Sequence, residues 1–246
     1  MKLGFIGAGK MATAITKGIG REGIWSVSDL SAADISAEAR RQYSDETGVQ
    51  CVENVGEVVR SADAFILAVK PQVAETVVRG IASEAQQKLM ISIAAGVSLG
   101  TLSNWLGHSR IIRVMPNTPL TVGKGATAYC CGPSATSDDG ALAAKIFGSV
   151  GIVLEVPESQ MNVVTALSGS GPAYIFETMQ ALAAAGESLG LSSDIARRLV
   201  AQTVGGAAEM VARGIGSPDE LRAAVTSKGG TTAEGLAKLK PAFKED

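Results

Sequence analysis

Residues 3–12 read LGFIGAGKMA and carry the clearest structural signal of the chain. The apolar run Leu3–Ile6 predicts a short buried strand, and the G-x-G-x-x-A pattern of Gly7, Gly9 and Ala12 follows it directly. In this pattern the first glycine permits a tight turn, the second lets the backbone approach a pyrophosphate, and the small third residue lets the next helix pack closely on the sheet. The helix N-terminus offers unpaired N–H groups to the anion. The stretch therefore predicts a dinucleotide-binding loop; the alternative is a tight turn without a ligand.

Short apolar runs alternate with helix-like stretches on both sides of this loop. Strands are predicted at Leu3–Ile6, Ile24–Ser28, Val49–Val52, Ala64–Val69, Leu89–Ala94, Ile111–Met115, Ala126–Cys131 and Ile152–Val156, and helices at residues 10–21, 34–44, 54–61 and 71–87. Apolar strands that alternate with helices are typical of a parallel sheet buried on both faces. We therefore expect an α/β fold, with a Rossmann-type dinucleotide-binding domain over residues 1–157.

The pattern changes after Glu158, beyond which no strand is predicted. Helices are predicted at Ala173–Gly190, Ser192–Arg213, Ser217–Ala224 and Thr231–Lys240, and Pro241 ends the last of them. So small and apolar a unit buries too little surface alone, which indicates burial against a second copy of the chain. Residues 158–246 are therefore expected to form an all-helical dimerisation domain.

The composition argues against several classes of function. The 246 residues are 46% apolar, which supports a folded core, and the net charge of −2 gives no basic face for nucleic acid or an anionic membrane. The apolar runs are short and broken, so no membrane span is predicted, and no signal peptide is expected before the first strand. Three cysteines, Cys51, Cys130 and Cys131, cannot form a disulfide framework and fit a reducing cytoplasm. No Cys/His cluster has metal-ligand spacing, and a single histidine, His108, argues against a histidine-centred mechanism.

An acidic residue that contacts the adenosine ribose is expected near the end of the second strand. Asp29 follows the predicted strand Ile24–Ser28 and lies 22 residues after the first glycine of the loop. Its carboxylate would accept a hydrogen bond from a ribose 2′-hydroxyl and repel a 2′-phosphate, which favours NADH slightly over NADPH. Ser28 and Ser31 could instead bind a phosphate, with Arg40 or Arg41 in reach. Both cofactors therefore stay open, and Asp29 could also serve only as a helix cap.

Polar or small residues end three further predicted strands, at the sheet edge where ligands bind in α/β folds. Lys70 follows the strand Ala64–Val69 and either contacts a ribose or phosphate or extends into solvent. The small residues of Ser92–Gly96 leave room for a ring, or permit close helix packing. Asn117 lies between two prolines in the turn Met115–Pro119 and offers a donor and an acceptor; a purely structural role is the alternative.

Two glycine motifs mark the helical part. The segment Ser168–Ala173 places Ser170 at the start of a long apolar helix, where it caps the helix or lets another backbone approach. The segment Val225–Thr232 joins two helices, and its two adjacent glycines allow left-handed backbone, so that successive N–H groups can form an anion-binding nest. The residues that would line the nest are Ser227, Gly229, Gly230, Thr231 and Thr232. Such a nest suits a small carboxylate; a plain helix–helix turn is the alternative.

In this order and spacing, the motifs resemble those of the pyrroline-5-carboxylate reductases, the enzymes of the last step of proline biosynthesis. The matching segments are the glycine loop, Ala68–Gln72, Ser92–Val97, Arg113–Pro119, Ser168–Tyr174 and Val225–Leu236. The resemblance implies reduction of Δ1-pyrroline-5-carboxylate to L-proline by NADPH or NADH. It also implies a homodimer, often assembled into larger rings. The composition adds the expectation of a cytoplasmic protein with neither nucleic acid nor a membrane as a partner.

The resemblance also implies which residues form the site. The cofactor would be held by Ile6, Gly7, Ala8, Gly9, Lys10, Met11, Ala12, Ala68, Val69, Lys70, Pro71, Ala94 and Ala95, and the positions of Ser28, Asp29 and Asn117 beside predicted strand ends add these three residues. The substrate would be bound by Ser170, Ser227, Gly229, Gly230, Thr231 and Thr232, and no metal is expected. Thr232 matches the threonine proposed in this family to hydrogen-bond the imine nitrogen. It is the expected catalytic residue, as a positioner or a proton relay to water, because a threonine is a poor acid.

Two other functions fit parts of the chain. A hydroxyacid dehydrogenase of similar two-domain shape would need an acid–base lysine in its helical domain, but no lysine lies between Met161 and Ser227, and Lys228 lies in a loop. A non-catalytic dinucleotide sensor would keep the glycine loop and would not need the hydroxyl-rich nest. Cofactor binding without turnover would support the sensor.

Overall fold

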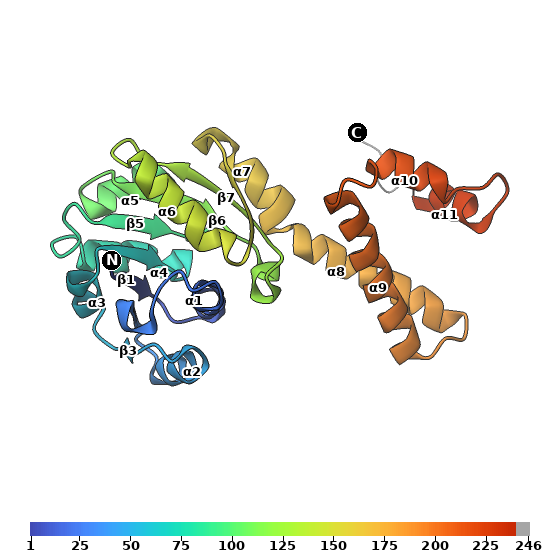
Figure 1. The fold of residues 1–246 in the computed structure, drawn as a ribbon. Helices are drawn as coiled ribbons and strands as arrows, with labels where there is room; N and C mark the ends of the chain where they lie inside the picture. Colours follow the sequence, from blue (N-terminus) through green and yellow to red (C-terminus); the bar gives the residue numbers. More distant parts are fainter. Residues whose placement is uncertain (240–246) are drawn as a thin grey trace. The chain divides into compact units, whose positions relative to one another are not determined.

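The computed structural model describes residues 1–239 and divides into two compact units, Met1–Tyr174 and Ile175 onward (Figure 1). We refer to them as unit 1 and unit 2. The division falls inside helix α8 (Gly171–Ser188), so residues 158–174 pack with unit 1. The sequence places these same residues in the helical domain, and the boundary between functional domains stays a prediction. The predicted helix end at Lys240 lies outside the described residues.

The described residues of unit 1 form an eight-stranded sheet with the order β3-β2-β1-β4-β5-β6-β7-β8. The strands are β1 (Leu3–Ile6), β2 (Leu30–Ala33), β3 (Cys51–Val52), β4 (Ala64–Leu67), β5 (Leu89–Ser92), β6 (Ile111–Met115), β7 (Gly125–Cys131) and β8 (Gly151–Glu155). All neighbours are parallel except β6 and β7, which run antiparallel. Strands β2 and β3 lie on one side of β1, and β4 to β8 lie on the other. The sheet therefore has a topological switch point between β1 and β4, and ligands of open α/β sheets bind at such a point.

Helices cover both faces of this sheet, as the alternating sequence pattern predicts. They are α1 (Lys10–Arg21), α2 (Ala37–Thr47), α3 (Val55–Ser61), α4 (Pro71–Gly80), α5 (Leu99–Leu106), α6 (Ser137–Gly148) and α7 (Met161–Val164), with the short turns η1 (Val27–Asp29), η2 (Thr118–Val122) and η3 (Glu158–Gln160) and the π-helix η4 (Thr165–Gly169). One buried apolar cluster joins the sheet to α1, α2 and α6, and a second joins it to α3, α4 and α5. Successive strand residues such as Phe5 and Ile6 belong to opposite clusters, because side chains alternate across a strand.

Three helices of unit 1 have no counterpart in the sequence prediction: the short α7 and the longer α5 and α6. Helix α5 contains glycine, threonine, serine and asparagine, which are poor helix formers, and it is held by the Ser98 cap and by burial of Leu99, Leu102 and Leu106. Helix α6 begins with a capping box, in which Thr136 and Asp139 each accept the other's backbone N–H. Caps and tertiary burial outweigh weak propensity in α5 and α6.

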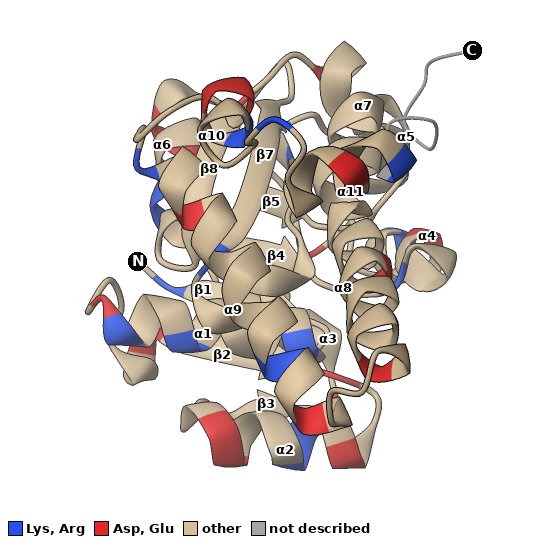
Figure 2. Cartoon of the chain, turned by 90° about the vertical axis from the view of Figure 1, so that its right-hand side faces the viewer, with Lys and Arg blue, Asp and Glu red and all other residues tan. Residues whose placement is uncertain are grey.

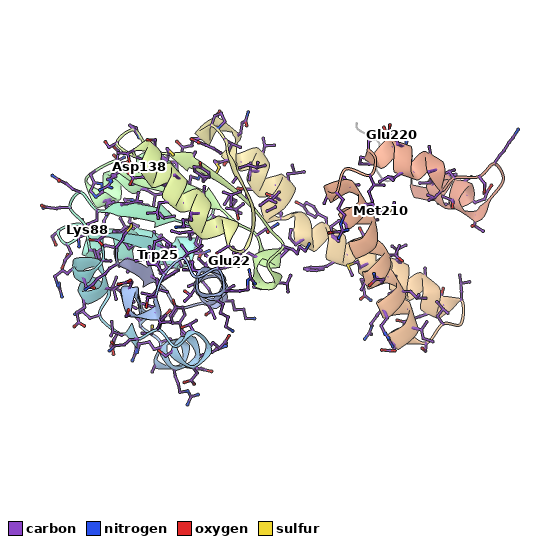
Figure 3. The ribbon with its side chains drawn as sticks, in the orientation of Figure 1. Glu22, Trp25, Lys88, Asp138, Met210 and Glu220 are labelled. Carbon is purple, nitrogen blue, oxygen red and sulfur yellow. The ribbon has the colours of Figure 1, made fainter. Side chains whose placement is uncertain are left out.

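The predicted second strand, Ile24–Ser28, is wrong. The chain forms a loop and the turn η1 there, and strand β2 begins only at Leu30. The apolar side chains of Ile24 and Trp25 pack on the core from the loop, and Trp25 is labelled in Figure 3. The Trp25 indole N–H donates to the Met1 carbonyl. Strand β2 itself reads Leu-Ser-Ala-Ala and gives a weak apolar signal, so the stronger neighbouring signal misplaced the strand.

Unit 2 consists, over its described residues, of α8 from Ile175 onward, α9 (Ser193–Ala212), α10 (Pro218–Ala224) and α11 (Thr231–Leu239). Ser192 caps α9, and Ser217 forms a capping box with Glu220. Helix α8 has only two charged residues among 18, and most of it is tan in Figure 2. Its Phe176 is 61% exposed, and the Leu199 side chain on α9 is 56% exposed. Large apolar side chains with this degree of exposure indicate a surface that another protein covers. No helix of the described residues is long and apolar enough to cross a membrane.

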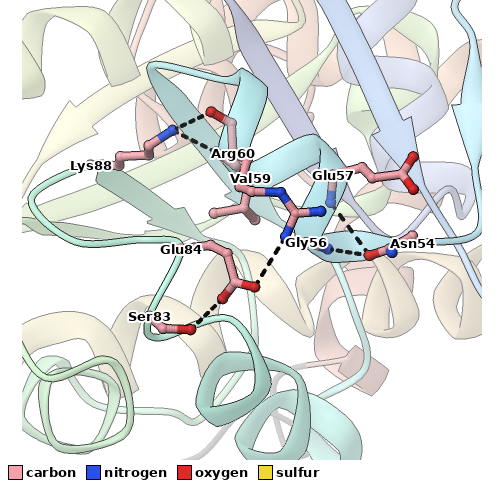
Figure 4. A network of polar contacts seen from close by, with 8 residues as sticks. All are labelled: Asn54, Gly56, Glu57, Val59, Arg60, Ser83, Glu84 and Lys88. Atoms are coloured by element: carbon pink, nitrogen blue, oxygen red, sulfur yellow. Dashed lines mark hydrogen bonds and ion pairs between the residues drawn. The ribbon is translucent and has the colours of Figure 1, made fainter.

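The side chain of Lys88, the residue before β5, links this strand to helix α3. The Lys88 ammonium donates to the carbonyl oxygens of Val59, Arg60 and Ala62 at 2.7, 2.8 and 2.7 Å. Figure 4 shows the contacts with Val59 and Arg60. These carbonyls lie at the C-terminal end of α3, where a cation also interacts favourably with the helix dipole.

Replacing Lys88 with methionine should lower the free energy of unfolding by about 1–3 kcal/mol, because partly buried carbonyls lose their donor. Chemical denaturation followed by circular dichroism measures this change. The exposed Lys145, on α6, provides the matched control Lys145→Met, for which we expect little change. Equal stability of the two variants would contradict the role of Lys88.

Candidate active site

The glycine loop lies at the switch point of the sheet. Gly7 has φ of +97°, and a Cβ at this position would lie 2.7 Å from the Ala68 carbonyl oxygen, in the loop that follows β4. The Gly7 N–H donates to the Ala33 carbonyl at 2.8 Å, which joins the ends of β1 and β2. Only glycine fits this turn, so the first glycine of the motif brings three strand ends together.

Helix α1 starts at this loop with its N-terminus open. Gly9 occupies the cap position, no side chain caps the helix, and its first turn holds no acidic residue. A Cβ built on Gly9 would meet no atom within 4 Å. Ala12 is fully buried, which permits close packing of α1 on the sheet. Free N–H groups, the positive end of the helix dipole and open space beside Gly9 together fit a pyrophosphate.

A cavity of about 470 Å³ adjoins the loop and lies entirely within unit 1. Its lining includes Ala8, Gly9 and Lys10 of the loop, and it continues along α1, α2 and η2. This volume is in the usual range for small-molecule sites.

The assignment of Ser28 and Asp29 to the cofactor rests on the misplaced strand and needs correction. Both residues lie in η1, before β2, whereas the glycine loop follows β1. Because β1 and β2 are parallel, their opposite ends lie at opposite edges of the sheet. The acidic residue that follows β2 is Asp34, and its Oδ2 accepts the Ala8 N–H at 2.9 Å. The reasoning about an acid at the strand end would have found Asp34 with the correct strand boundary.

The loops after β4 and β5 reach the same edge. Ala68 donates its N–H to the Ile6 carbonyl at 2.7 Å, and Ile93 donates to the Leu67 carbonyl at 3.0 Å. Lys70 is exposed and precedes Pro71, the first residue of α4. Ala94 is buried and Ala95 is exposed. The segments Ala68–Pro71 and Ala94–Ala95 therefore lie beside the glycine loop, and their contacts with a cofactor stay a prediction.

Asn117 has a clear structural role. Its Nδ2 donates to the Ser168 carbonyl at 3.0 Å, and its Oδ1 accepts the Ala126 N–H at 2.9 Å. The amide thus joins the turn after β6 to β7 and to the π-helix η4. A Cβ on Gly169 would lie 2.3 Å from the terminal methyl carbon of Met115, so this glycine permits η4 to approach β6 closely. Ser170 follows η4 and is half-buried within unit 1.

The predicted nest forms a tight turn in unit 2. Gly229 has φ of +74°, and the Gly230 N–H donates to the Ser227 carbonyl at 3.1 Å. The Gly230 carbonyl accepts the Ala233 N–H at 3.0 Å, so α11 starts directly after the glycine pair. The N–H groups of Thr231 and Thr232 belong to the first turn of α11, which leaves them without partners in the helix. Of the two glycines only Gly229 has a positive φ, so the N–H groups of Thr231 and Thr232 are the donors that the turn leaves for an anion.

The single histidine and the three cysteines lie outside the glycine loop and the nest. His108 Nε2 lies 3.1 Å from the Ala85 carbonyl, and its Nδ1 accepts the Arg110 N–H, so the ring serves the backbone. Burial raises the pKa of the thiols of Cys51, Cys130 and Cys131 to about 11, with nearby carboxylates adding to the effect. No group of metal-ligating side chains is present in the described residues.

The cysteines of the native protein should therefore react with iodoacetamide at pH 8 about 100-fold more slowly than those of the unfolded chain. The raised thiol pKa leaves about 100-fold less of the reactive thiolate at this pH. The rate should rise with pH up to about pH 11, because burial favours the neutral thiol until then. Mass spectrometry of the alkylated protein gives both rates. Similar rates in native and unfolded protein would contradict the burial effect.

Comparison with known proteins covers the whole chain. A family model described as pyrroline-5-carboxylate reductase dimerisation matches residues 158–245, and one described as NADP oxidoreductase coenzyme F420-dependent matches residues 2–96. The pyrroline-5-carboxylate reductase of Arabidopsis thaliana is 44% identical over 97% of this chain and 87% of its own length. The chain belongs to the pyrroline-5-carboxylate reductase family. The Methanosarcina acetivorans enzyme of the same name is 41% identical, over 98% of this chain and 90% of its own.

Solved structures agree with this membership. The pyrroline carboxylate reductase of Plasmodium falciparum, with NADP bound, has a TM-score of 0.88 at 35% identity and covers 98% of this chain and 90% of its own. The pyrroline-5-carboxylate reductase of Coxiella burnetii has a TM-score of 0.90 at 37% identity, with the same coverage. Prephenate dehydrogenase of A. aeolicus, at 13% identity and a TM-score of 0.61, shares the fold alone.

The family membership confirms the resemblance seen in the motifs. It also confirms the fold, an NAD(P)-binding Rossmann domain followed by a helical dimerisation domain, and the class of protein, an oxidoreductase. The two alternative assignments, a hydroxyacid dehydrogenase and a dinucleotide sensor, each account for fewer of the sequence motifs than membership of this family does.

Proposed function

We propose that the chain reduces Δ1-pyrroline-5-carboxylate to L-proline with NADPH or NADH, as the last step of proline biosynthesis. The observation that carries this proposal is 44% identity to a pyrroline-5-carboxylate reductase over 97% of the chain, which includes the glycine loop of unit 1 and the nest of unit 2. The cytoplasm is the expected compartment. The dimerisation domain implies a homodimer, and a ring of dimers is its expected larger assembly.

Unit 1 would hold the cofactor. The open N-terminus of α1 and the residues Ile6, Gly7, Ala8, Gly9, Lys10, Met11 and Ala12 would take the pyrophosphate, and Ala68, Val69, Lys70, Pro71, Ala94 and Ala95 would line the nicotinamide and its ribose. When bound, the reduced nicotinamide supplies a hydride for the imine carbon. Asn117 would act on this region through its two backbone hydrogen bonds.

The nest would hold the substrate. Its members Ser227, Gly229, Gly230, Thr231 and Thr232 offer N–H groups and hydroxyls to the carboxylate, as does the start of α11 through its helix dipole. Ser170 would contribute a further hydroxyl. We assign residues 1–157 to cofactor binding and 158–246 to dimerisation and substrate binding.

The residues needed for the reaction are positioning groups. The protonated imine is the better hydride acceptor, and it can form in solution before binding. Thr232 would then hold the ring nitrogen by a hydrogen bond, and the nest would fix the carboxylate, so that the imine carbon is held in one orientation. After hydride transfer the ring nitrogen is a neutral amine that takes up a proton from water, and the threonine hydroxyl can relay this proton rather than act as the acid itself.

Oxidation of NADH and of NADPH in the presence of pyrroline-5-carboxylate tests the proposal, with loss of nicotinamide absorbance as the signal. We expect turnover with this substrate and none with a 2-oxo acid such as pyruvate. Dinucleotide binding without turnover of pyrroline-5-carboxylate would overturn the proposal in favour of a sensor. Turnover of the 2-oxo acid alone would favour a hydroxyacid dehydrogenase.

A further inference from the structure

We propose that Asp34 makes this enzyme prefer NADH to NADPH, by accepting a hydrogen bond from the adenosine ribose 2′-hydroxyl and by repelling a 2′-phosphate. The inference rests on the proposed function only in that a nicotinamide dinucleotide binds at the glycine loop. Asp34 lies outside the sequence motifs of the family resemblance and follows strand β2.

Asp34 lies where a ribose-binding acid is required. It follows β2 directly, and its N–H donates to the Val52 carbonyl of β3 at 3.0 Å, which fixes it at the carboxyl edge of the sheet. Its Oδ2 accepts the Ala8 N–H at 2.9 Å, so the carboxylate is one hydrogen bond from the pyrophosphate loop. The side chain is half-buried and remains accessible. Each carboxylate oxygen has two lone pairs, so capacity remains for a ribose hydroxyl.

The same carboxylate occupies the place that a 2′-phosphate would need. Helix α2 begins beside it, and the N-terminus of a helix is a natural site for a phosphate. Here Asp34 Oδ1 already accepts the Ser36 N–H at 2.8 Å, and the Ser36 hydroxyl accepts the Ala39 N–H as a helix cap. A 2′-phosphate would meet a negative charge instead of free donors, at a distance where like charges repel strongly.

The nearest positive charge, Arg40, is already engaged and does not offer its guanidinium to a 2′-phosphate. The Arg40 guanidinium donates to the Asp34 and Ile35 carbonyls at 2.8 and 3.0 Å, and it pairs with Glu53. The residue after Asp34 is Ile35, which is 85% exposed and has no donor for a phosphate. Arg41 has no ion pair among the described residues and is the one cation of α2 that could oppose this arrangement.

Dissociation constants of NADH and NADPH, measured by nicotinamide fluorescence without substrate, test the inference independently of turnover. In the wild-type protein we expect NADH to bind at least about 10-fold more tightly, the value of one charge-assisted hydrogen bond. Asp34→Asn keeps an oxygen for the Ala8 N–H but removes the charge, so we expect this ratio to fall to about 1 or below. Asp29→Asn, at the other edge of the sheet, and Arg41→Ala should leave the NADH preference in place.

The inference would be overturned by tighter binding of NADPH to the wild-type protein, by an unchanged ratio in Asp34→Asn, or by a change in Asp29→Asn as large as that in Asp34→Asn. Failure of both cofactors to bind would also overturn it. If Asp34→Asn fails to fold, the ratio of the two dissociation constants in Asp34→Ser, compared with that in the wild-type protein, tests the inference instead. An NADH preference that depends on Asp34, in a protein without pyrroline-5-carboxylate turnover, would support this inference while rejecting the proposed function.

Discussion

Replacing Thr232 with alanine should lower kcat/KM for pyrroline-5-carboxylate by about 10- to 1000-fold and leave the affinity for the dinucleotide unchanged. Thr232 is the second residue of α11 and is half-buried. No hydrogen bond within the described residues involves its hydroxyl, which leaves the group free to bind the imine nitrogen. Because the hydroxyl orients the ring, its loss permits orientations of the bound imine that do not react.

Two variants separate this role from a structural one. Thr232→Ser restores a hydroxyl at the same position and should recover most of the activity. Thr203→Ala removes a hydroxyl that donates to the Leu199 carbonyl inside α9, and it should leave the kinetics unchanged. Steady-state kinetics at saturating cofactor, with thermal unfolding midpoints to check the fold, give the comparison. Wild-type kinetics in Thr232→Ala would remove Thr232 from the mechanism.

The glycine loop and the order of strands and helices could be predicted from the sequence because their signals are local. Gly7 needs a positive φ wherever this turn occurs, and Ala12 must be small wherever the helix packs on the sheet. The serine caps of α9 and α10 likewise depend on neighbours within three residues. In such stretches the sequence pattern and the structure have the same physical cause.

The ribose-binding acid could not be located because its signal depends on a strand that is itself weak. Strand β2 reads Leu-Ser-Ala-Ala and is buried between β1 and β3, so partners distant in sequence stabilise it. The stronger apolar run at Ile24–Trp25 packs on the core without forming a strand. An error of a few residues moved the expected acid from Asp34 to Asp29, at the opposite edge of the sheet.

The environment of Asn117 was also beyond sequence reasoning. A ligand contact and a structural role both require the same amide in the same turn. Only the positions of Ser168 and Ala126, which are 51 and 9 residues away, show that both ends of the amide are engaged by the backbone. The packing of η4 against the Met115 side chain at Gly169 likewise joins residues that are distant in sequence.

Replacing Gly9 with valine should weaken dinucleotide binding by about 100-fold or more without unfolding the protein. Gly9 has an ordinary extended backbone, with φ of −79° and ψ of −179°, and a Cβ there meets no atom within 4 Å. The protein therefore accommodates the side chain, but the valine occupies the space before the open N-terminus of α1. The pyrophosphate would lose two or more charge-assisted hydrogen bonds, each worth about 1.5–3 kcal/mol.

Other glycines of the same segment provide the controls for this variant. Gly20, near the end of α1, also has open space at its Cβ, so Gly20→Val should leave both binding and stability nearly unchanged. Gly7→Ala should instead destabilise the fold, because its positive φ and the Ala68 carbonyl at 2.7 Å leave no room for a side chain. Cofactor fluorescence and thermal unfolding distinguish the three outcomes. Cofactor affinity of the wild-type level in Gly9→Val would mean that the pyrophosphate does not lie against this glycine, and the dinucleotide would have to bind elsewhere on unit 1.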